Sequence, residues 1–285
     1  MAAVLSPTDD RIFKAMLIHP DAEPALMDLI SASIWRTVTS VNIRKTELPI
    51  MDTEEKNERL DVNCVVDGGD QANVEIQGSR IEEVANDHEN FINKTIYYLT
   101  DLHSSQKSKG LKYNELVRTY QITFSAYTVF PEYPDYVSLV NMRRANGDLI
   151  TDQINALIVE LSKLGGVLKK PVEEMTPLEM WSAFLRYAAD PGQRELINEI
   201  LKRREAMAMA GTVLRTISKD EHERARYMAR RKYETDMTSN ILTAEARGEI
   251  RERQKWQTVL ADKDAALADK DALIAELRAR LGEGS

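Results

Sequence analysis

Hydrophobic positions in the first third of the chain follow a helical period and then change to a strand period. Apolar residues within 12–17 and within 23–34 recur every three to four positions, and Thr8-Asp9-Asp10 precedes the first run as a capping sequence. Both runs predict helices. Residues 60–66 and 72–78 instead alternate between two kinds of side chain, as strands do. Asp67-Gly68-Gly69-Asp70 separates them and is typical of a turn, so the pattern predicts a β-hairpin.

Helical and strand patterns stay mixed up to about residue 165. A long helical stretch is expected over 81–106, and Gly110 ends it. Three further strand patterns cover 117–127, 136–142 and 154–161. We therefore expect an α/β fold in which helices flank a mixed sheet.

After Gly165-Gly166 only helical patterns continue. Helices are expected over 178–189 and 193–216, and Pro177 suits the first turn of the former. At the end of the chain Leu260, Leu267, Ile274 and Leu281 recur every seven residues. This spacing favours a coiled coil that joins copies of the chain into a homo-oligomer. A single amphipathic helix folded back on the protein is the alternative. The predicted organisation is a sheet domain at 1–165, a helical region at 166–250 and a coiled-coil segment at 251–285.

Composition and charge narrow the classes of protein. The net charge is −8, to which residues 202–255 contribute +5 and residues 256–285 contribute −2, leaving −11 for residues 1–201. The basic segment 202–255 is either a surface for an acidic partner or a solvated helix face. Cys64 is the only cysteine, which excludes an intrachain disulfide and a cysteine-rich zinc site. No apolar run of about 18 residues and no secretory signal is seen, so we expect a cytoplasmic protein without membrane spans.

The hairpin carries the candidate chemistry. Glu75 and Gln77 lie two residues apart on the second strand and therefore share a face. A turn centred near residues 68–69 places Asp61 opposite or diagonal to Glu75 on that face, while Cys64 points to the other face and is expected in the core. Two converging carboxylates repel each other unless a cation such as Mg²⁺ lies between them. Such a metal supports hydrolysis of phosphodiesters. The alternative is that these side chains lie on a solvent-facing outer surface.

Three segments together resemble one known family. They are Asp10-Arg11-Ile12-Phe13-Lys14-Ala15-Met16-Leu17, then Lys56-Asn57-Glu58-Arg59-Leu60-Asp61-Val62 with Asn73-Val74-Glu75-Ile76-Gln77, and then Ile96-Tyr97-Tyr98-Leu99 with 110–116 and Tyr120-Gln121-Ile122-Thr123. In this order they are similar to the Rpn family of recombination-promoting nucleases, also called PD-(D/E)XK nuclease family transposases. The resemblance covers about residues 9–165.

The resemblance implies a restriction-endonuclease-like core and metal-dependent DNA cleavage in recombination, mobile-element spread or defence. Asp61 and Glu75 would hold Mg²⁺ or Mn²⁺ with the carbonyl of Ile76. Gln77 stands where the wider superfamily has lysine, and it can orient water or phosphate only by hydrogen bonds.

The resemblance also bears on which residues contact DNA and on whether the chain cleaves it. The family often has an arginine before its tyrosine pair, where this chain has Lys94, and we expect Arg80 and Lys94 to contact DNA. Because residues 1–201 are acidic, a catalytically silent DNA-binding or protein-interaction module on a nuclease fold is the alternative function.

Overall fold

The structure is a computed structural model that describes residues 4–44, 62–78, 87–106, 112–220 and 223–230, with isolated positions beyond. The chain divides into one compact unit, Met1–Tyr227, and a second unit, Met228–Ser285. Asp61 and Arg80, which were predicted to lie in the functional site, fall outside the described residues.

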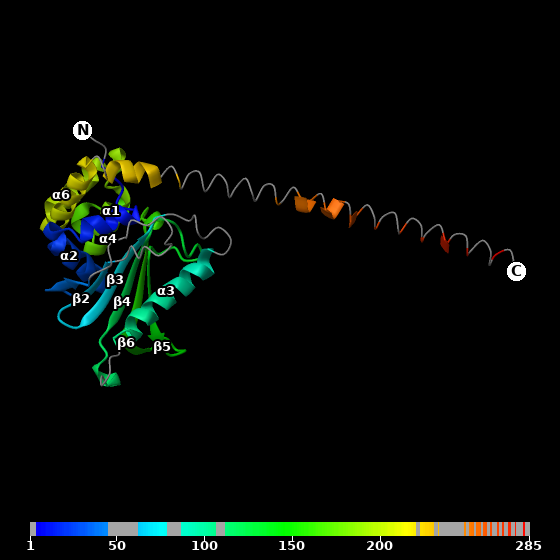
Figure 1. Cartoon of the computed structure of the whole chain (residues 1–285), viewed down its shortest axis with the longest axis horizontal. Helices are drawn as coiled ribbons and strands as arrows, with labels where there is room; N and C mark the ends of the chain where they lie inside the picture. Colours follow the sequence, from blue (N-terminus) through cyan, green and yellow to red (C-terminus); the bar gives the residue numbers. More distant parts are fainter. Residues whose placement is uncertain are drawn as a thin grey trace. The chain divides into compact units, whose positions relative to one another are not determined.

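A six-stranded mixed sheet forms the centre of the first unit (Figure 1). The strand order is β1-β2-β3-β4-β6-β5; β3, β4 and β6 run parallel, and the remaining neighbours pair antiparallel. The strands are β1 (Val41–Ile43), β2 (Val62–Val66), β3 (Asp70–Gln77), β4 (Thr119–Ser125), β5 (Val137–Arg143) and β6 (Leu149–Glu160). The predicted mixed sheet is thereby confirmed.

The described helices precede, interrupt and follow the strands in the chain. They are α1 (Asp10–Leu17), α2 (Glu23–Ile34), α3 (Asp87–Ser104), α4 (Pro177–Tyr187), α5 (Arg194–Arg203) and α6 (Glu205–Lys219), with short 3-10 turns such as η1 (Pro20–Ala22) between them. The Asp9 carboxylate caps α1 by accepting from the backbone N–H groups of Arg11 and Ile12. Thr176 and Glu179 form a capping box at the start of α4. These caps satisfy N–H groups that have no partner within a helix.

The β2–β3 hairpin has a fixed register. Val62 pairs with Val74 and Val66 with Asp70. At the turn, Asp67 and Gly68 have φ values of 49° and 74°, a conformation that glycine adopts without strain. The Asp67 carboxylate accepts from Thr39 N and Ser40 N, and its pKa is lowered mainly by the bond from Thr39 N. The pairing agrees with the sequence estimate to within one residue, and this register assigns each β3 side chain to a face.

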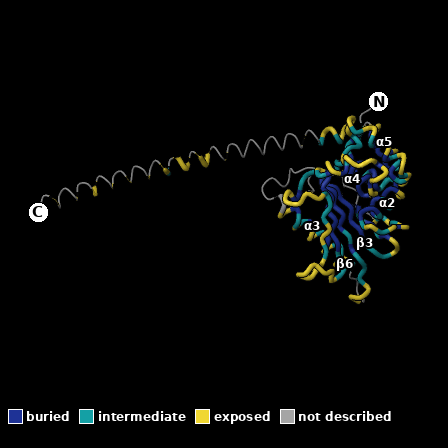
Figure 2. Tube along the Cα trace, turned by 180° about the vertical axis from the view of Figure 1, so that it is seen from behind, coloured by how far each residue is buried: buried dark blue, intermediate teal, exposed yellow. Residues whose placement is uncertain are grey.

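One face of the sheet carries the main hydrophobic core. Ala72, Val74 and Ile76 of β3 and Ile122 and Phe124 of β4 are buried in one cluster with residues of α1, α2 and the helices that follow the sheet. Phe13 of α1 and Phe124 of β4 have ring centroids 6.2 Å apart. Cys64 is 1% exposed in this core, as predicted, and burial raises its thiol pKa to about 12. Figure 2 shows β3 among the buried parts of this unit.

Helix α3 lies on the opposite face, over β4 and β6. Phe91 of α3 packs with Ile158 of β6 in a small second cluster. At the other end of α3, His103 Nδ1 lies 2.9 Å from Thr119 Oγ1 of β4. The sheet is therefore covered on both faces.

Helices after residue 165 share the core of the sheet. Trp181 Nε1 on α4 donates to Asp28 Oδ2 on α2 at 2.8 Å, and Leu5 N donates to Ser218 Oγ on α6 at 2.9 Å. The sequence predicted one domain boundary near residue 165 and another near residue 250, and both stay predictions.

Two elements differ from the expectation. The single helix predicted over 193–216 is two helices, because Arg204 is extended (φ −132°, ψ 112°) and its guanidinium binds Asp28. This partly buried ion pair favours the extended conformation of Arg204. Strand β1 was not predicted, since three residues are too few to show a period.

In the second unit, Leu260, Leu267 and Ile274 are helical and exposed. A coiled coil over 251–285 stays a prediction. Across the part of the chain that the structure describes, no helix is both long and apolar enough to span a bilayer.

Candidate functional site

The α3-facing side of β3 and β4 carries a row of buried polar side chains. The parallel register sets Asn73 beside Gln121, Glu75 beside Thr123 and Gln77 beside Ser125. All of these except Gln77 are buried, and Glu75 is only 3% exposed. Both strands thus present polar groups in the interior at successive positions of one face.

Hydrogen bonds join this row into one network centred on Glu75. Asn73 Nδ2 donates to Gln121 Oε1 at 2.9 Å, and Gln121 Nε2 donates to Thr123 Oγ1 at 3.2 Å. Thr123 Oγ1 then donates to Glu75 Oε1 at 3.0 Å, and Gln77 Nε2 approaches the same oxygen at 3.4 Å. The bonds from Thr123 and Gln77 help to fix the direction of the Glu75 carboxylate.

Burying this row of polar side chains costs free energy, so its presence calls for an explanation. Sheets covered on both faces are usually apolar on both, and buried polar groups lower the free energy of unfolding unless they are hydrogen-bonded. Even when satisfied, such networks contribute little net stability compared with apolar packing. A polar row at the centre of the sheet is therefore better explained by chemistry than by stability. The solvent-facing alternative considered for Glu75 does not hold.

Glu160 provides an internal comparison, because it is a second buried carboxylate on the same face of the sheet. Its Oε1 accepts from Val129 N at 2.6 Å and Phe130 N at 3.0 Å. Its Oε2 binds Lys163 Nζ at 2.7 Å. Glu160 is thus neutralised by a lysine and anchors the chain after β4, which is a structural task.

Backbone groups at the end of β3 complete the geometry near Glu75. Gln77 O accepts from Ala126 N, which continues the ladder to β4. Because carbonyls alternate in direction along a strand, the Ile76 carbonyl points to the β2 side. Gly78 follows, and a Cβ there would lie 2.3 Å from Thr8 O. Glycine at this position allows the segment before α1 to lie against the end of β3.

The remaining predicted site residues are the DNA contact Lys94 and the metal ligand Asp61. Lys94 lies on α3, where its Nζ is 5.7 Å from the ring centroid of Tyr98. Within the residues that the structure describes, no group of three or more His, Cys, Asp and Glu side chains is arranged to hold a metal. Asp61, the second predicted acid, is outside those residues.

Sequence reasoning missed the partners of Glu75. Thr123, Gln121 and Asn73 were not assigned to the site, although polar residues alternate along β4 in phase with Glu75. His103 was not assigned to the site either; its ring contacts Thr119, and burial lowers its pKa. Alternation of polar residues within an otherwise apolar strand was the available signal.

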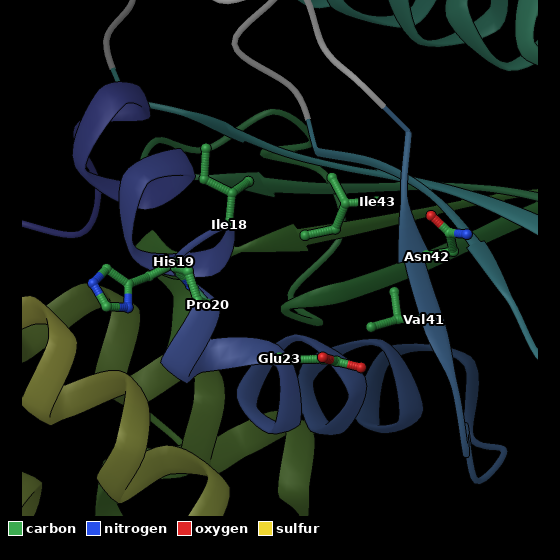
Figure 3. A pocket seen from close by; sticks show the side chains of 7 residues that line it. All are labelled: Ile18, His19, Pro20, Glu23, Val41, Asn42 and Ile43. Atoms are coloured by element: carbon green, nitrogen blue, oxygen red, sulfur yellow. The ribbon is translucent and has the colours of Figure 1, made fainter.

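A separate pocket of about 240 Å³ lies near the β1 edge of the sheet (Figure 3). Its lining includes Ile18, His19, Glu23, Val41 and Ile43. Val41 and Ile43 pair with Val66 and Cys64, whose side chains belong to the hydrophobic core. This pocket is therefore on the opposite face from Glu75 and takes no part in the network.

Comparison with known proteins identifies one family. A sequence model described as PD-(D/E)XK nuclease family transposase matches residues 7–244. Neither the curated proteins nor the solved structures contain a match to the chain. The matched range includes the whole sheet and helices α1 to α6.

Proposed function

Because the chain belongs to the PD-(D/E)XK nuclease family transposases, we propose that it is a metal-dependent endonuclease that hydrolyses phosphodiester bonds in DNA. The observation that carries the proposal is the buried Glu75 carboxylate, which Thr123 and Gln77 orient on the polar face of the sheet. Recombination, mobile-element spread and defence are the settings in which such an activity is used.

Oxygen atoms at the end of β3 suit a hard divalent cation. Mg²⁺ and Mn²⁺ favour carboxylate and carbonyl oxygens. Glu75 supplies a carboxylate, and the Ile76 carbonyl points to the β2 side. Asp61 precedes Val62 in the sequence, and Val62 pairs with Val74. The hairpin pattern in the sequence predicts Asp61 opposite or diagonal to Glu75. The proposed ligands are thus Asp61, Glu75 and the carbonyl of Ile76.

The roles of the protein groups follow from their chemistry. Thr123 and Gln77 hold one Glu75 oxygen in place, which reduces the reorganisation needed when a ligand binds. Gln77 is neutral, so it orients a water or a phosphate oxygen and cannot act as a general base. A bound divalent cation lowers the pKa of its water and offsets charge on the attacked phosphate.

Positive charge for the DNA backbone has three proposed sources. Lys94 lies on α3, on the same side of the sheet as Glu75. Arg80 follows β3 in the sequence by three residues, and the segment 202–255 carries a balance of +5. Phosphate binding through lysine and arginine weakens as salt rises, so DNA affinity should fall with ionic strength. Chain association through the 251–285 heptads would bring two such sites to one DNA.

Cleavage of supercoiled plasmid by the full-length protein tests the proposal. We expect nicking with Mg²⁺ or Mn²⁺ and none with EDTA. Glu75→Gln should reduce the rate at least about 100-fold, because it replaces a charged ligand with a neutral one of the same size. Asp61→Asn should have a similar effect, and calorimetric Mn²⁺ binding should weaken in both variants.

Glu132→Gln is the matched control, since Glu132 is exposed between β4 and β5 and removal of its charge should leave cleavage unchanged. If wild type and Glu75→Gln give the same trace nicking, the nuclease proposal fails. DNA binding without metal-dependent cleavage would instead favour the silent DNA-binding alternative, for which the −11 balance of residues 1–201 is the motivation.

A further inference from the structure

The two edges of the sheet are very different. Strand β1 has three residues, whereas β5 has seven and, among the described strands, pairs only with β6 (Figure 1). The outer edge of β5 therefore presents backbone N–H and C=O groups that another strand can bind. Proteins usually protect a long edge with charged residues, proline, β-bulges or a covering helix. Residues 137–141 of β5 contain no charged residue and no proline, and the register shifts against β6 begin only after Asn141.

Apolar side chains extend along this edge on both faces. Leu139 is 44% and Val140 is 50% exposed, and successive strand residues point to opposite faces. Met142, Leu149 and Ile150 in the same hairpin are also exposed. An exposed apolar hairpin next to an open strand edge is typical of an interaction surface.

Charges of opposite sign lie at the two ends of β5. Asp135 precedes the strand by two residues, and Arg143 and Arg144 end it. Asp135 and Arg144 are exposed, and within the described part of the chain neither side chain forms an ion pair. Arg143 donates to Asn141 Oδ1 and Gly147 O, both at 2.8 Å. The strand is acidic at its start, apolar at its middle and basic at its end.

We propose that β5 pairs antiparallel with β5 of a second copy across a two-fold axis near Leu139 and Val140. This arrangement is self-complementary, because it brings the Asp135 end of each strand to the Arg143–Arg144 end of the other. The backbone edges pair, the exposed apolar residues pack together, and two sets of opposite charges meet. A parallel arrangement would instead place like charges together at both ends.

Site-specific cross-linking of the full-length protein tests this pairing. Single substitutions Leu139→Cys and Val140→Cys cover the two registers that a two-fold axis allows, and a short bis-maleimide is the probe. Cys64 is 1% exposed and burial raises its pKa to about 12, so wild type should not react. Tyr97→Cys on α3 is the matched control, since Tyr97 is 61% exposed and lies away from the edge.

We expect a covalent dimer from at least one β5 variant and little from Tyr97→Cys. This result would hold even if the C-terminal heptads also join two chains, because the reagent reports only on the neighbourhood of the cysteine. Equal yields at all three positions, or no dimer at either β5 position, would overturn the proposal and leave the edge to a different partner.

A charge exchange in the cross-linking background provides a second measurement. Asp135→Arg or Arg144→Glu alone should slow dimer capture about threefold or more, because each pair occurs twice across a two-fold axis. The double variant Asp135→Arg/Arg144→Glu restores opposite charges and should recover the wild-type rate. If the double variant is slower than either single one, the antiparallel arrangement is wrong.

Discussion

The two faces of strands β3 and β4 are formed by alternating residues of the same two segments, yet they differ in polarity. Val74, Ile76, Ile122 and Phe124 point to one side and join the hydrophobic core. The side chains between them, including Glu75 and Thr123, point to the other side and form a buried polar network. Both rows are buried, so solvent exposure does not explain the difference in polarity.

Apolar burial accounts for stability, whereas an equally buried polar row contributes little net free energy of folding. The contrast with Glu160 shows what a structural carboxylate requires on this sheet: two backbone donors and a lysine. The Glu75 carboxylate accepts a hydrogen bond from the Thr123 hydroxyl and lies 3.4 Å from the Gln77 amide nitrogen. One face therefore maintains the fold, and the other holds the Glu75 carboxylate, the proposed metal ligand, in a defined orientation.

The largest expected effect is on the apolar face. Phe124→Ala should lower the free energy of unfolding by about 3–5 kcal/mol, because it leaves a cavity opposite Phe13. Thr123→Ala, one residue away on the polar face, should cost only about 1–2 kcal/mol. Urea denaturation of both variants measures the difference, and equal losses would contradict the division of tasks between the faces.

An intermediate effect is expected on activity from the polar face. Thr123→Val keeps the side-chain shape but removes the hydroxyl that donates to Glu75. Metal-dependent cleavage should fall about tenfold to a hundredfold, as for other groups that orient a metal ligand. Thr123→Ser retains a hydroxyl and should keep most of the rate. A full rate in Thr123→Val would show that orientation of Glu75 by this bond is unimportant.

The smallest expected effect is a change in how the free energy of unfolding depends on pH. It concerns His103, near the end of α3, whose ring contacts Thr119. Burial lowers the pKa of His103 from its usual 6.5, so the unfolded chain binds the proton more readily than the folded one. This contribution to stability is complete above about pH 6.5 and is lost as pH falls toward the lower, folded value. Unfolding free energies at pH 7 and pH 5 should therefore differ more in wild type than in His103→Gln. A larger difference in the variant would contradict the sign.

Local patterns predicted much of this fold, since periodicity depends on neighbours in sequence. The helix Glu23–Ile34 was predicted with the bounds it has, and the hairpin register followed from the turn at Gly68-Gly69. The break at Arg204 was not predictable in this way. It depends on Asp28, which lies 176 residues earlier in the chain and also accepts from Trp181.

The residues of the candidate site also fall into those predictable from sequence neighbours and those that depend on distant parts of the chain. Glu75 and Gln77 were assigned from strand alternation within one hairpin and from the resemblance of three sequence segments to a known family. Thr123 and Gln121 join them only because β4 lies parallel to β3 in a particular register, and that pairing follows a helix and a long connection. Pairing between strands distant in sequence is set by tertiary packing and was beyond a reading of single segments.

If the proposed nuclease activity and β5 pairing both hold, the strand order sets the spacing of the two sites. A two-fold axis perpendicular to the sheet leaves both copies of Glu75 on the same face, and β4, β6 and β5 separate β3 from the shared edge. Joined through β5, the two β3 strands would be seven strand spacings of about 4.8 Å apart, or about 34 Å before twist is considered. One turn of B-form DNA also spans about 34 Å. A pair of chains would thus address two phosphates on one side of the duplex, about ten base pairs apart.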